Sequence, residues 1–126
     1  MNILIVDDKP NLIRVTAVAL RTLGCETLGA GTIAAATQLL ATQKVDAVLL
    51  DVNLGGENGL EFLSQLTSQP ASPPVVIFSS HTKDEIAAVA LSHGAFDCLL
   101  KPFTLDDLRQ LIEKITQHRL TSGRLA

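Results

Sequence analysis

Five short apolar runs, spaced along the whole chain, constrain the fold more than any other feature of this sequence. Each run has the length of a β-strand that is buried on both faces, because such strands are continuously apolar rather than alternating. The runs cover residues 3–6, 25–28, 47–50, 75–78 and 98–100. Amphipathic stretches separate them, so strands and helices are expected to alternate. This alternation predicts right-handed βαβ units and one doubly wound α/β domain, in which a five-stranded parallel sheet is flanked by five helices.

The stretches between the apolar runs carry the start signals of helices. Pro10 suits the first turn of one helix, and Thr32 and Thr104 are suitable N-caps for two others. The last residues, 119–126, carry no periodic pattern and are expected to form a flexible tail or the start of a linker. The predicted domain therefore covers residues 1–118.

Composition argues against several classes of protein. The 126 residues include 47% hydrophobic and 18% charged residues, which is typical of a single soluble globular domain. A net charge of -3 and the lack of a Lys/Arg cluster argue against a nucleic-acid surface. The longest apolar runs are far below the ~18 residues that span a membrane, and no signal peptide is visible. We therefore expect a cytoplasmic protein, with Cys25 and Cys98 as reduced thiols because they lack metal-site or disulfide spacing.

Acidic residues follow two of the apolar runs at the point where each run ends. Asp7 and Asp8 come after the first run, and Asp51 comes after the third. Ligands of open α/β sheets bind at the carboxyl ends of the strands, where the strand order reverses. With the strand order 2-1-3-4-5, the first and third strands are neighbours at that point. The three carboxylates would then share one pocket, although a single acid at a strand end is more often an N-cap or a solvated loop residue.

Three carboxylates in one pocket repel each other unless positive charge compensates them. Lys101, at the end of the fifth run, could offset one charge, and a hard divalent cation such as Mg²⁺ could offset more. Asn53 lies just past Asp51, where its backbone carbonyl could face the same cation. Ser79 and Ser80 end the fourth run, and the Ser79 hydroxyl could help to hold a phosphoryl group in the pocket.

These residues resemble the receiver domains of response regulators in two-component signalling, the CheY-like superfamily. The motifs "ILIVDD", "VLLDVNLGGENGLEFL", "VVIFSS" and "LLKPF" carry the resemblance, which covers residues 1–118. The resemblance implies that Asp51 is the phosphoacceptor and that a sensor histidine kinase or a histidine phosphotransfer protein is the donor. It also implies Mg²⁺, or Mn²⁺ in its place, as the cofactor. Asp8, Asp51 and the backbone carbonyl of Asn53 would bind the ion directly, and Asp7 would act through water.

The resemblance also implies how the signal is read. Lys101 and the Ser79 hydroxyl would contact the phosphate, and Pro102 would follow a cis peptide bond. The face formed by the fourth helix, the fifth strand and the fifth helix would repack and signal to an output domain or effector. Asn53 and His81 would flank the path of the hydrolytic water. The domain would be a regulatory phosphoacceptor rather than an enzyme, assisting its own phosphorylation and dephosphorylation, as a monomer or a weak phosphorylation-dependent dimer. Two further residues belong to the switch region: Ser80 and Phe103.

Three positions depart from the common pattern of this family. Gly55 stands where Pro is frequent, which predicts a more mobile loop after the acceptor. Cys98 stands where an aromatic switch residue is usual, so the coupling of the switch hydroxyl to a rotating ring is not expected, and a packed thiol is favoured over a redox sensor. Leu111 replaces the Arg that pairs across the dimer of winged-helix transcription factors, which argues against that dimer.

Three rival interpretations fit the residues less well. A haloacid-dehalogenase-type phosphatase needs a general acid two residues after its nucleophile, where this chain has Asn53. A flavodoxin-like nucleotide binder needs phosphate-cradling amides in its first loop, where this chain has "DDKPN". A degenerate receiver would have lost an acid or the lysine. The pattern is compatible with a stand-alone regulator, a phosphorelay intermediate or a piece of a larger regulator.

Overall fold

The structure is a computed structural model that describes residues 1–79 and 83–123. Seven strands and five helices occur in these residues. The strands are β1 (Asn2–Val6), β2 (Glu26–Ala30), β3 (Ala47–Asp51), β4 (Asn53–Leu54), β5 (Glu57–Asn58), β6 (Val75–Ser79) and β7 (Asp97–Leu100). The helices are α1 (Pro10–Thr22), α2 (Ile33–Thr42), α3 (Gly59–Thr67), α4 (Lys83–Ser92) and α5 (Leu105–Gly123).

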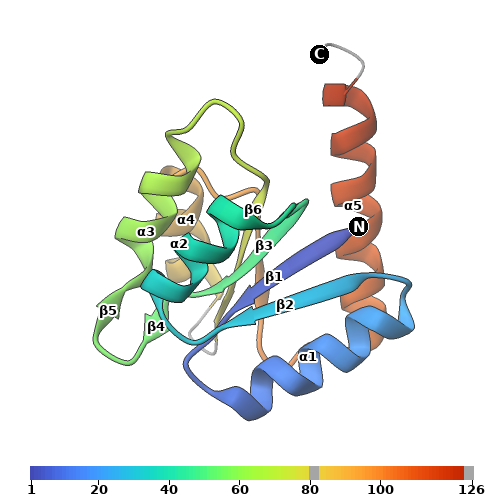
Figure 1. Ribbon diagram of the computed structural model, residues 1–126, viewed down its shortest axis with the longest axis horizontal. Helices are drawn as coiled ribbons and strands as arrows, with labels where there is room; N and C mark the ends of the chain where they lie inside the picture. The colour runs from blue at the N-terminus through green and yellow to red at the C-terminus, as the bar shows by residue number, and fades with distance from the viewer. Residues whose placement is uncertain (80–82, 124–126) are drawn as a thin grey trace.

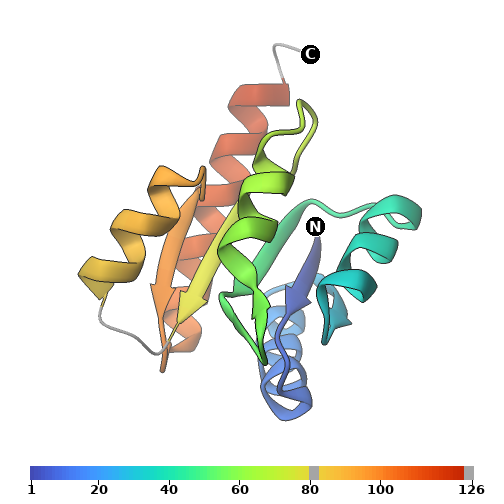
Figure 2. The same cartoon turned by 90° about the vertical axis from the view of Figure 1, so that its left-hand side faces the viewer.

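Five of the strands form one parallel sheet in the order β2-β1-β3-β6-β7. Counted within this sheet along the chain, the order is 2-1-3-4-5, which confirms the predicted topology. The strand order reverses between β1 and β3, so the carboxyl ends of these two strands lie side by side. The sheet is the middle layer of the molecule, with α1 and α5 on one face and α2, α3 and α4 on the other (Figures 1 and 2).

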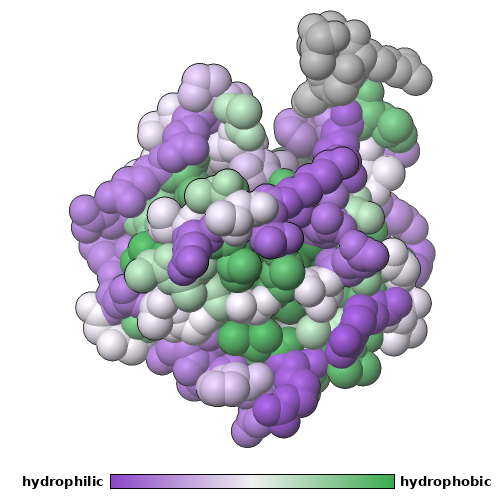
Figure 3. Space-filling model, viewed as in Figure 1, coloured by the Kyte–Doolittle hydropathy of each residue, from purple (hydrophilic) through white to green (hydrophobic). Residues whose placement is uncertain are grey.

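The three central strands, β1, β3 and β6, are buried on both faces, which explains why their runs are continuously apolar, whereas Glu26 and Gly29 of the edge strand β2 are exposed. Alternate residues of the central strands point to opposite faces and join two separate core clusters. The cluster on the side of α2, α3 and α4 receives Leu4, Val6, Val48, Leu50, Val75 and Ile77 from the sheet. The cluster on the side of α1 and α5 receives Ile3, Ile5, Ala47, Leu49, Val76 and Phe78. The face seen in Figure 3 mixes hydrophilic and hydrophobic areas.

Side chains cap several helices as their sequence predicts. Thr32 Oγ1 accepts a hydrogen bond from the Ala35 backbone N–H (3.1 Å) at the start of α2. Before α5, Thr104 and Asp107 cap each other reciprocally, each side chain accepting the backbone N–H of the other residue at 3.0 and 2.8 Å. Each cap satisfies backbone groups that a helix end leaves unpaired.

Helix α5 is longer than the sequence pattern indicated. It continues through residues 119–123, which carry no periodic pattern, and a tail or linker that begins at residue 119 stays a prediction. Within this segment the Arg119 guanidinium lies 3.0 Å from Asp46 Oδ1. The other oxygen of Asp46 accepts the backbone N–H of Asn2 at 2.7 Å, so α5 is tied to the amino-terminal edge of the sheet. The helix projects past this edge (Figure 1).

Among residues 1–79 and 83–123, no helix combines the length and the apolar character that crossing a membrane requires. Cys25 is buried, and this burial raises the pKa of its thiol. Cys98 is half-buried in β7 and packs against the core cluster on the side of α2, α3 and α4. This packing agrees with a structural thiol at position 98.

Candidate functional site

Three carboxylates meet at the carboxyl edge of the sheet, where β1 and β3 end next to each other. Asp7 and Asp8 follow β1, and Asp51 is the last residue of β3. One oxygen from each of the three carboxylates lies within 4.8 Å of the other two. Asp7 and Asp51 are buried, with 0% and 3% of their surface exposed, whereas Asp8 is exposed. The site is thus a cluster of two buried acids and one exposed acid, and this cluster is the carboxylate pocket.

Hydrogen bonds from the backbone fix the two buried carboxylates. Asp7 Oδ1 accepts the backbone N–H of Lys9 at 2.9 Å, and the Asp7 backbone N–H continues the sheet by donating to the Ala30 carbonyl at 3.0 Å. Asp51 Oδ1 accepts the backbone N–H of Asn53 at 2.9 Å. In both cases the carboxylate accepts a hydrogen bond from the backbone N–H two residues further along the chain, and this bond fixes one of its two oxygens. The second oxygen of each carboxylate therefore faces the pocket in a fixed direction.

The Lys101 ammonium forms ion pairs with those second oxygens. Lys101 directly follows β7, and its Nζ lies 3.0 Å from Asp51 Oδ2 and 3.3 Å from Asp7 Oδ2. Only 17% of its side chain is exposed, so the two ion pairs are largely shielded from water. The peptide bond between Lys101 and Pro102 is cis, the geometry that the resemblance implied.

The Phe78 ring packs against the Lys101 ammonium, a contact that the sequence did not predict. The Lys101 Nζ lies 4.6 Å from the centroid of the Phe78 ring, within the range of a cation–π interaction. The edge of a second ring, that of Phe103, packs against Phe78 with the centroids 6.1 Å apart. No spacing rule joins a strand residue to a lysine on the neighbouring strand, so only the tertiary structure shows this pair.

The charges of this site do not cancel. Lys101 pairs with two of the three carboxylates, and Asp8 has a long ion pair of 3.7 Å with the exposed Lys9. Carboxylate oxygens this close repel each other, so a further cation would offset part of this repulsion. The oxygen donors of Asp7, Asp8 and Asp51 suit a hard divalent cation such as Mg²⁺, which prefers one or two carboxylates and retains several waters.

The loop after Asp51 forms a small β-hairpin, an element that the sequence analysis did not predict. Strands β4 and β5 pair antiparallel, and Gly55 and Gly56 make the two-residue turn between them. The hairpin is anchored at both ends: Leu54 is buried in the core, and Glu57 Oε1 accepts the backbone N–H of Ile33 at 3.1 Å. A Gly-Gly pair between two short segments is a hairpin signal, and it could have predicted this element.

The remaining candidate residues lie around this pocket. Ser79 ends β6 and pairs in register with Leu100, the residue before Lys101, so its backbone lies at the same edge of the sheet. Ser80 and His81 lie outside the described residues. Cys98 lies within β7, where it pairs in register with Ile77.

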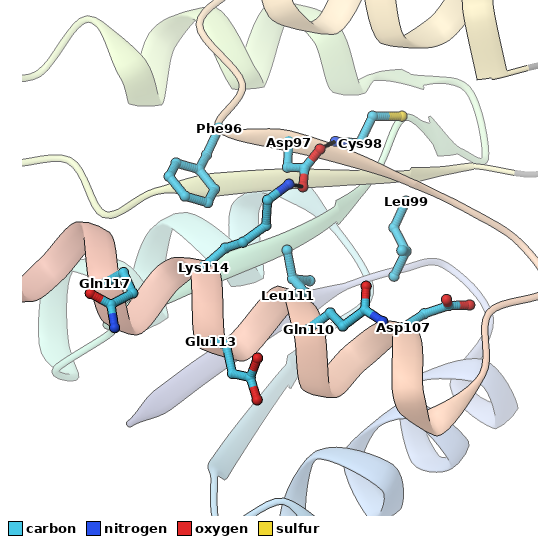
Figure 4. A pocket seen from close by; sticks show the side chains of 10 residues that line it. All are labelled: Phe96, Asp97, Cys98, Leu99, Asp107, Gln110, Leu111, Glu113, Lys114 and Gln117. Carbon is cyan, nitrogen blue, oxygen red and sulfur yellow. Dashed lines mark hydrogen bonds and ion pairs between the residues drawn. The ribbon is translucent and has the colours of Figure 1, made fainter.

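A groove runs along the surface between β7 and α5 (Figure 4). Its volume is about 850 Å³. Lys114 Nζ reaches across it to Asp97 Oδ2 at 2.8 Å, so a charged pair joins the helix to the strand. The strand that forms one wall of this groove is the strand that delivers Lys101 to the carboxylate pocket.

Comparisons with known proteins agree with this geometry. Residues 3–113 match the family described as the response regulator receiver domain. The regulatory protein AtoC of Escherichia coli K12 is 35% identical over 115 residues, which are 91% of this chain and 25% of AtoC. The alginate biosynthesis transcriptional regulatory protein AlgB of Pseudomonas putida is 37% identical over 123 residues, which are 98% of this chain and 28% of AlgB. This chain therefore spans about a quarter of the length of these curated relatives.

Solved structures show the same architecture. The crystal structure of NtrX from Brucella abortus superposes with a TM-score of 0.90 at 30% identity, covering 98% of this chain and 28% of NtrX. The separate receiver domain of the same NtrX superposes with a TM-score of 0.84 at 32% identity, covering 91% of this chain and 98% of that domain.

Proposed function

This chain belongs to the response regulator receiver domains, the phosphoacceptor modules of two-component systems, and from this premise we propose that Asp51 accepts the phosphoryl group. The observation that carries the proposal is the position of Lys101. Its Nζ lies 3.0 Å from Asp51 Oδ2, in the pocket where the three carboxylates converge. The receiver domain, on this proposal, covers residues 1–118.

The chemistry is the transfer of a phosphoryl group from a phosphohistidine. An oxygen of the Asp51 carboxylate attacks the phosphorus, the phosphorus–nitrogen bond of the donor breaks, and the leaving imidazole nitrogen keeps the electron pair. The hydrogen bond from the Asn53 backbone N–H holds Oδ1 in place during this attack. Lys101 faces the oxygens of the transferred group and stabilises their negative charge. On this proposal the chain assists its own phosphorylation and dephosphorylation, and its role is regulatory.

The carboxylates fit a divalent cation, Mg²⁺ or Mn²⁺. We assign Asp8, Asp51 and the backbone carbonyl of Asn53 as direct ligands and Asp7 as a ligand through water. A bound cation neutralises the carboxylates and the oxygens of the incoming phosphoryl group. The two buried acids are oriented by their backbone hydrogen bonds, so the chain presents a fixed set of oxygens before the cation arrives.

The proposed partners follow from the family. The phosphoryl donor is a sensor histidine kinase or a histidine phosphotransfer protein, and the location is the cytoplasm. The curated relatives are longer regulators, so an output domain or a separate effector is the proposed receiver of the signal. On this proposal the domain itself contacts neither nucleic acid nor a membrane.

The proposed signalling surface is formed by α4, β7 and α5. A phosphate on Asp51 adds about -1.5 to -2 charges at one point, and Ser79 and Lys101 respond to it. The surface that includes the groove between β7 and α5 (Figure 4) then shifts between two populations of conformations. Leu111 is 3% exposed and packs in the core under α5, so this position does not offer a charged dimer contact. We propose a monomer or a weak phosphorylation-dependent dimer.

A phosphorylation assay with one variant and one control tests the acceptor. Acetyl phosphate and Mg²⁺ should add one phosphoryl mass to the wild type, and Asp51→Asn should abolish the addition. Asp46→Asn is the matched control, because Asp46 lies at the opposite edge of the sheet, where it pairs with Arg119. This control should still be phosphorylated. A phosphoryl mass that persists in Asp51→Asn and maps to another residue would overturn the assignment.

A further inference from the structure

The turn of the β4–β5 hairpin lies against the carboxylate pocket. Asn53 pairs with Asn58 and Leu54 with Glu57, which leaves Gly55 and Gly56 as the two residues of the turn. Their φ angles are +57° and +100°, and positive φ at both positions is typical of the tight turn that matches the twist of a hairpin. Two interactions hold this turn in its position: Leu54 is buried in the core, and Glu57 accepts a hydrogen bond from the backbone N–H of Ile33 in α2.

A side chain at the first glycine of the turn would contact Asp8, and one at the second would contact nothing. A methyl group built on Gly55 would lie 3.0 Å from Asp8 Oδ2 and 3.8 Å from Asp8 Cγ. A methyl group on Gly56 would have no atom within 4 Å. The two neighbouring glycines therefore share the strained backbone conformation, but only Gly55 borders the acid.

Asp8 is the least restrained acid of the pocket. Its side chain is 31% exposed, and its ion pair with Lys9 is long, at 3.7 Å, to a side chain that is itself 57% exposed. Asp7 and Asp51, by contrast, each accept a backbone hydrogen bond and the Lys101 ammonium. Because Gly55 lacks a Cβ, the space beside the Asp8 carboxylate stays open on the side of the hairpin turn.

We infer that Gly55 is a positioning residue for the Asp8 carboxylate and thereby sets the affinity of this chain for its divalent cation. The inference rests on the cation site proposed above. A Cβ at position 55 would lie 3.0 Å from Asp8 Oδ2, so the Asp8 carboxylate would have to shift from its present position relative to Asp7 and Asp51. Proline, which is frequent here in the family, requires φ near −65° and cannot adopt the +57° of this turn. This chain therefore uses glycine to bring the loop close to the acid.

Two alanine variants separate this effect from backbone strain. Gly55→Ala and Gly56→Ala both place a side chain at positive φ, and strain of that kind is present with and without the cation, so it cancels in the dissociation constant. Displacement of the Asp8 carboxylate, by contrast, weakens only the cation-bound state and therefore raises the dissociation constant. We expect Gly55→Ala to weaken Mg²⁺ binding on the order of 10-fold, the usual effect of disturbing a residue that orients a metal ligand. Gly56→Ala should change the affinity by less than about twofold, since its methyl group meets no neighbour.

The assay is a Mg²⁺ titration of the purified protein, followed by backbone amide resonances in NMR spectra. Asp8→Ala is titrated in parallel, because it reports on the proposed cation site itself. Equal losses in Gly55→Ala and Gly56→Ala, or no loss in either, would overturn the role of Gly55. Wild-type affinity in Asp8→Ala would instead overturn the cation site. Should Gly55→Ala not fold, Gly55→Asn replaces it, since asparagine tolerates positive φ but carries the Cβ that contacts Asp8.

Discussion

Neutralising Asp8 should stabilise the protein in the absence of metal. The Asp8→Asn substitution keeps the shape of the side chain and removes one of three negative charges whose oxygens lie within 4.8 Å of one another. The two other carboxylates are buried and share the single ammonium of Lys101. Asp8 is the exposed acid of the pocket, where its charge is repelled by both, and its loss should leave the fold intact.

Coulomb's law gives the size of the effect. Two unit charges 4.8 Å apart repel by roughly 0.9 kcal/mol in bulk water and by roughly 3.5 kcal/mol at an effective dielectric constant of 20. Asp8 is 31% exposed, and Lys101 already offsets part of the field, so a repulsion of about 1–2 kcal/mol is realistic. Loss of the exposed pair with Lys9 subtracts at most about 0.5 kcal/mol. The net expectation is a gain of about 1 kcal/mol in the free energy of unfolding.

Urea unfolding in EDTA measures the repulsion among the carboxylates, and urea unfolding in Mg²⁺ measures the stabilisation that the cation provides. In EDTA, Asp8→Asn should be more stable than the wild type, and added NaCl should shrink the difference because salt screens the repulsion. At Mg²⁺ concentrations 100 times the wild-type dissociation constant, the wild type should gain about 2.7 kcal/mol. The variant should lose most of that gain. A variant that is less stable in EDTA would refute the repulsion, and an equal gain from Mg²⁺ in both proteins would mean that the ion binds elsewhere.

Two further predictions concern Lys101 and His81. Lys101→Met leaves the buried Asp7 and Asp51 without their cation, so the free energy of unfolding in urea without Mg²⁺ should fall by about 3–5 kcal/mol; wild-type stability would show that these ion pairs contribute nothing. His81→Ala should slow the loss of phosphate from Asp51 without blocking phosphorylation. Phosphate-affinity gels give the lifetimes, and a lifetime unchanged by the substitution would leave His81 without a role.

The sheet and the acid cluster could be predicted from the sequence because they depend on local rules. In a parallel sheet all carboxyl ends lie at one edge, so the apolar runs that precede Asp7 and Asp51 place both acids at that edge. The same rule placed Lys101, which directly follows β7. That β1 and β3 are neighbours does not follow from where the runs end; it needed the strand order, which the sequence analysis took as a condition and the structure confirms.

Two features that the sequence did not predict involve contacts between distant segments. Helix α5 continues to residue 123, and its Arg119 pairs with Asp46, which no helical pattern shows. The Phe78 ring packs against the Lys101 ammonium, whereas the apolar character of Phe78 predicted only core packing. The hairpin after Asp51 is local: its strands, two residues long, are too short to show an alternation of apolar and polar residues, and only its Gly-Gly turn could have indicated it.

The most direct test of the central claim is to identify the phosphorylated residue chemically. Borohydride reduces an aspartyl phosphate to homoserine, and tandem mass spectrometry of the digested protein then locates it. After incubation with acetyl phosphate and Mg²⁺, homoserine should appear at position 51 and should be absent when the acyl phosphate is omitted. Homoserine at position 7 or 8, or a phosphoryl group that borohydride does not remove, would contradict the assignment of Asp51 as the phosphoacceptor.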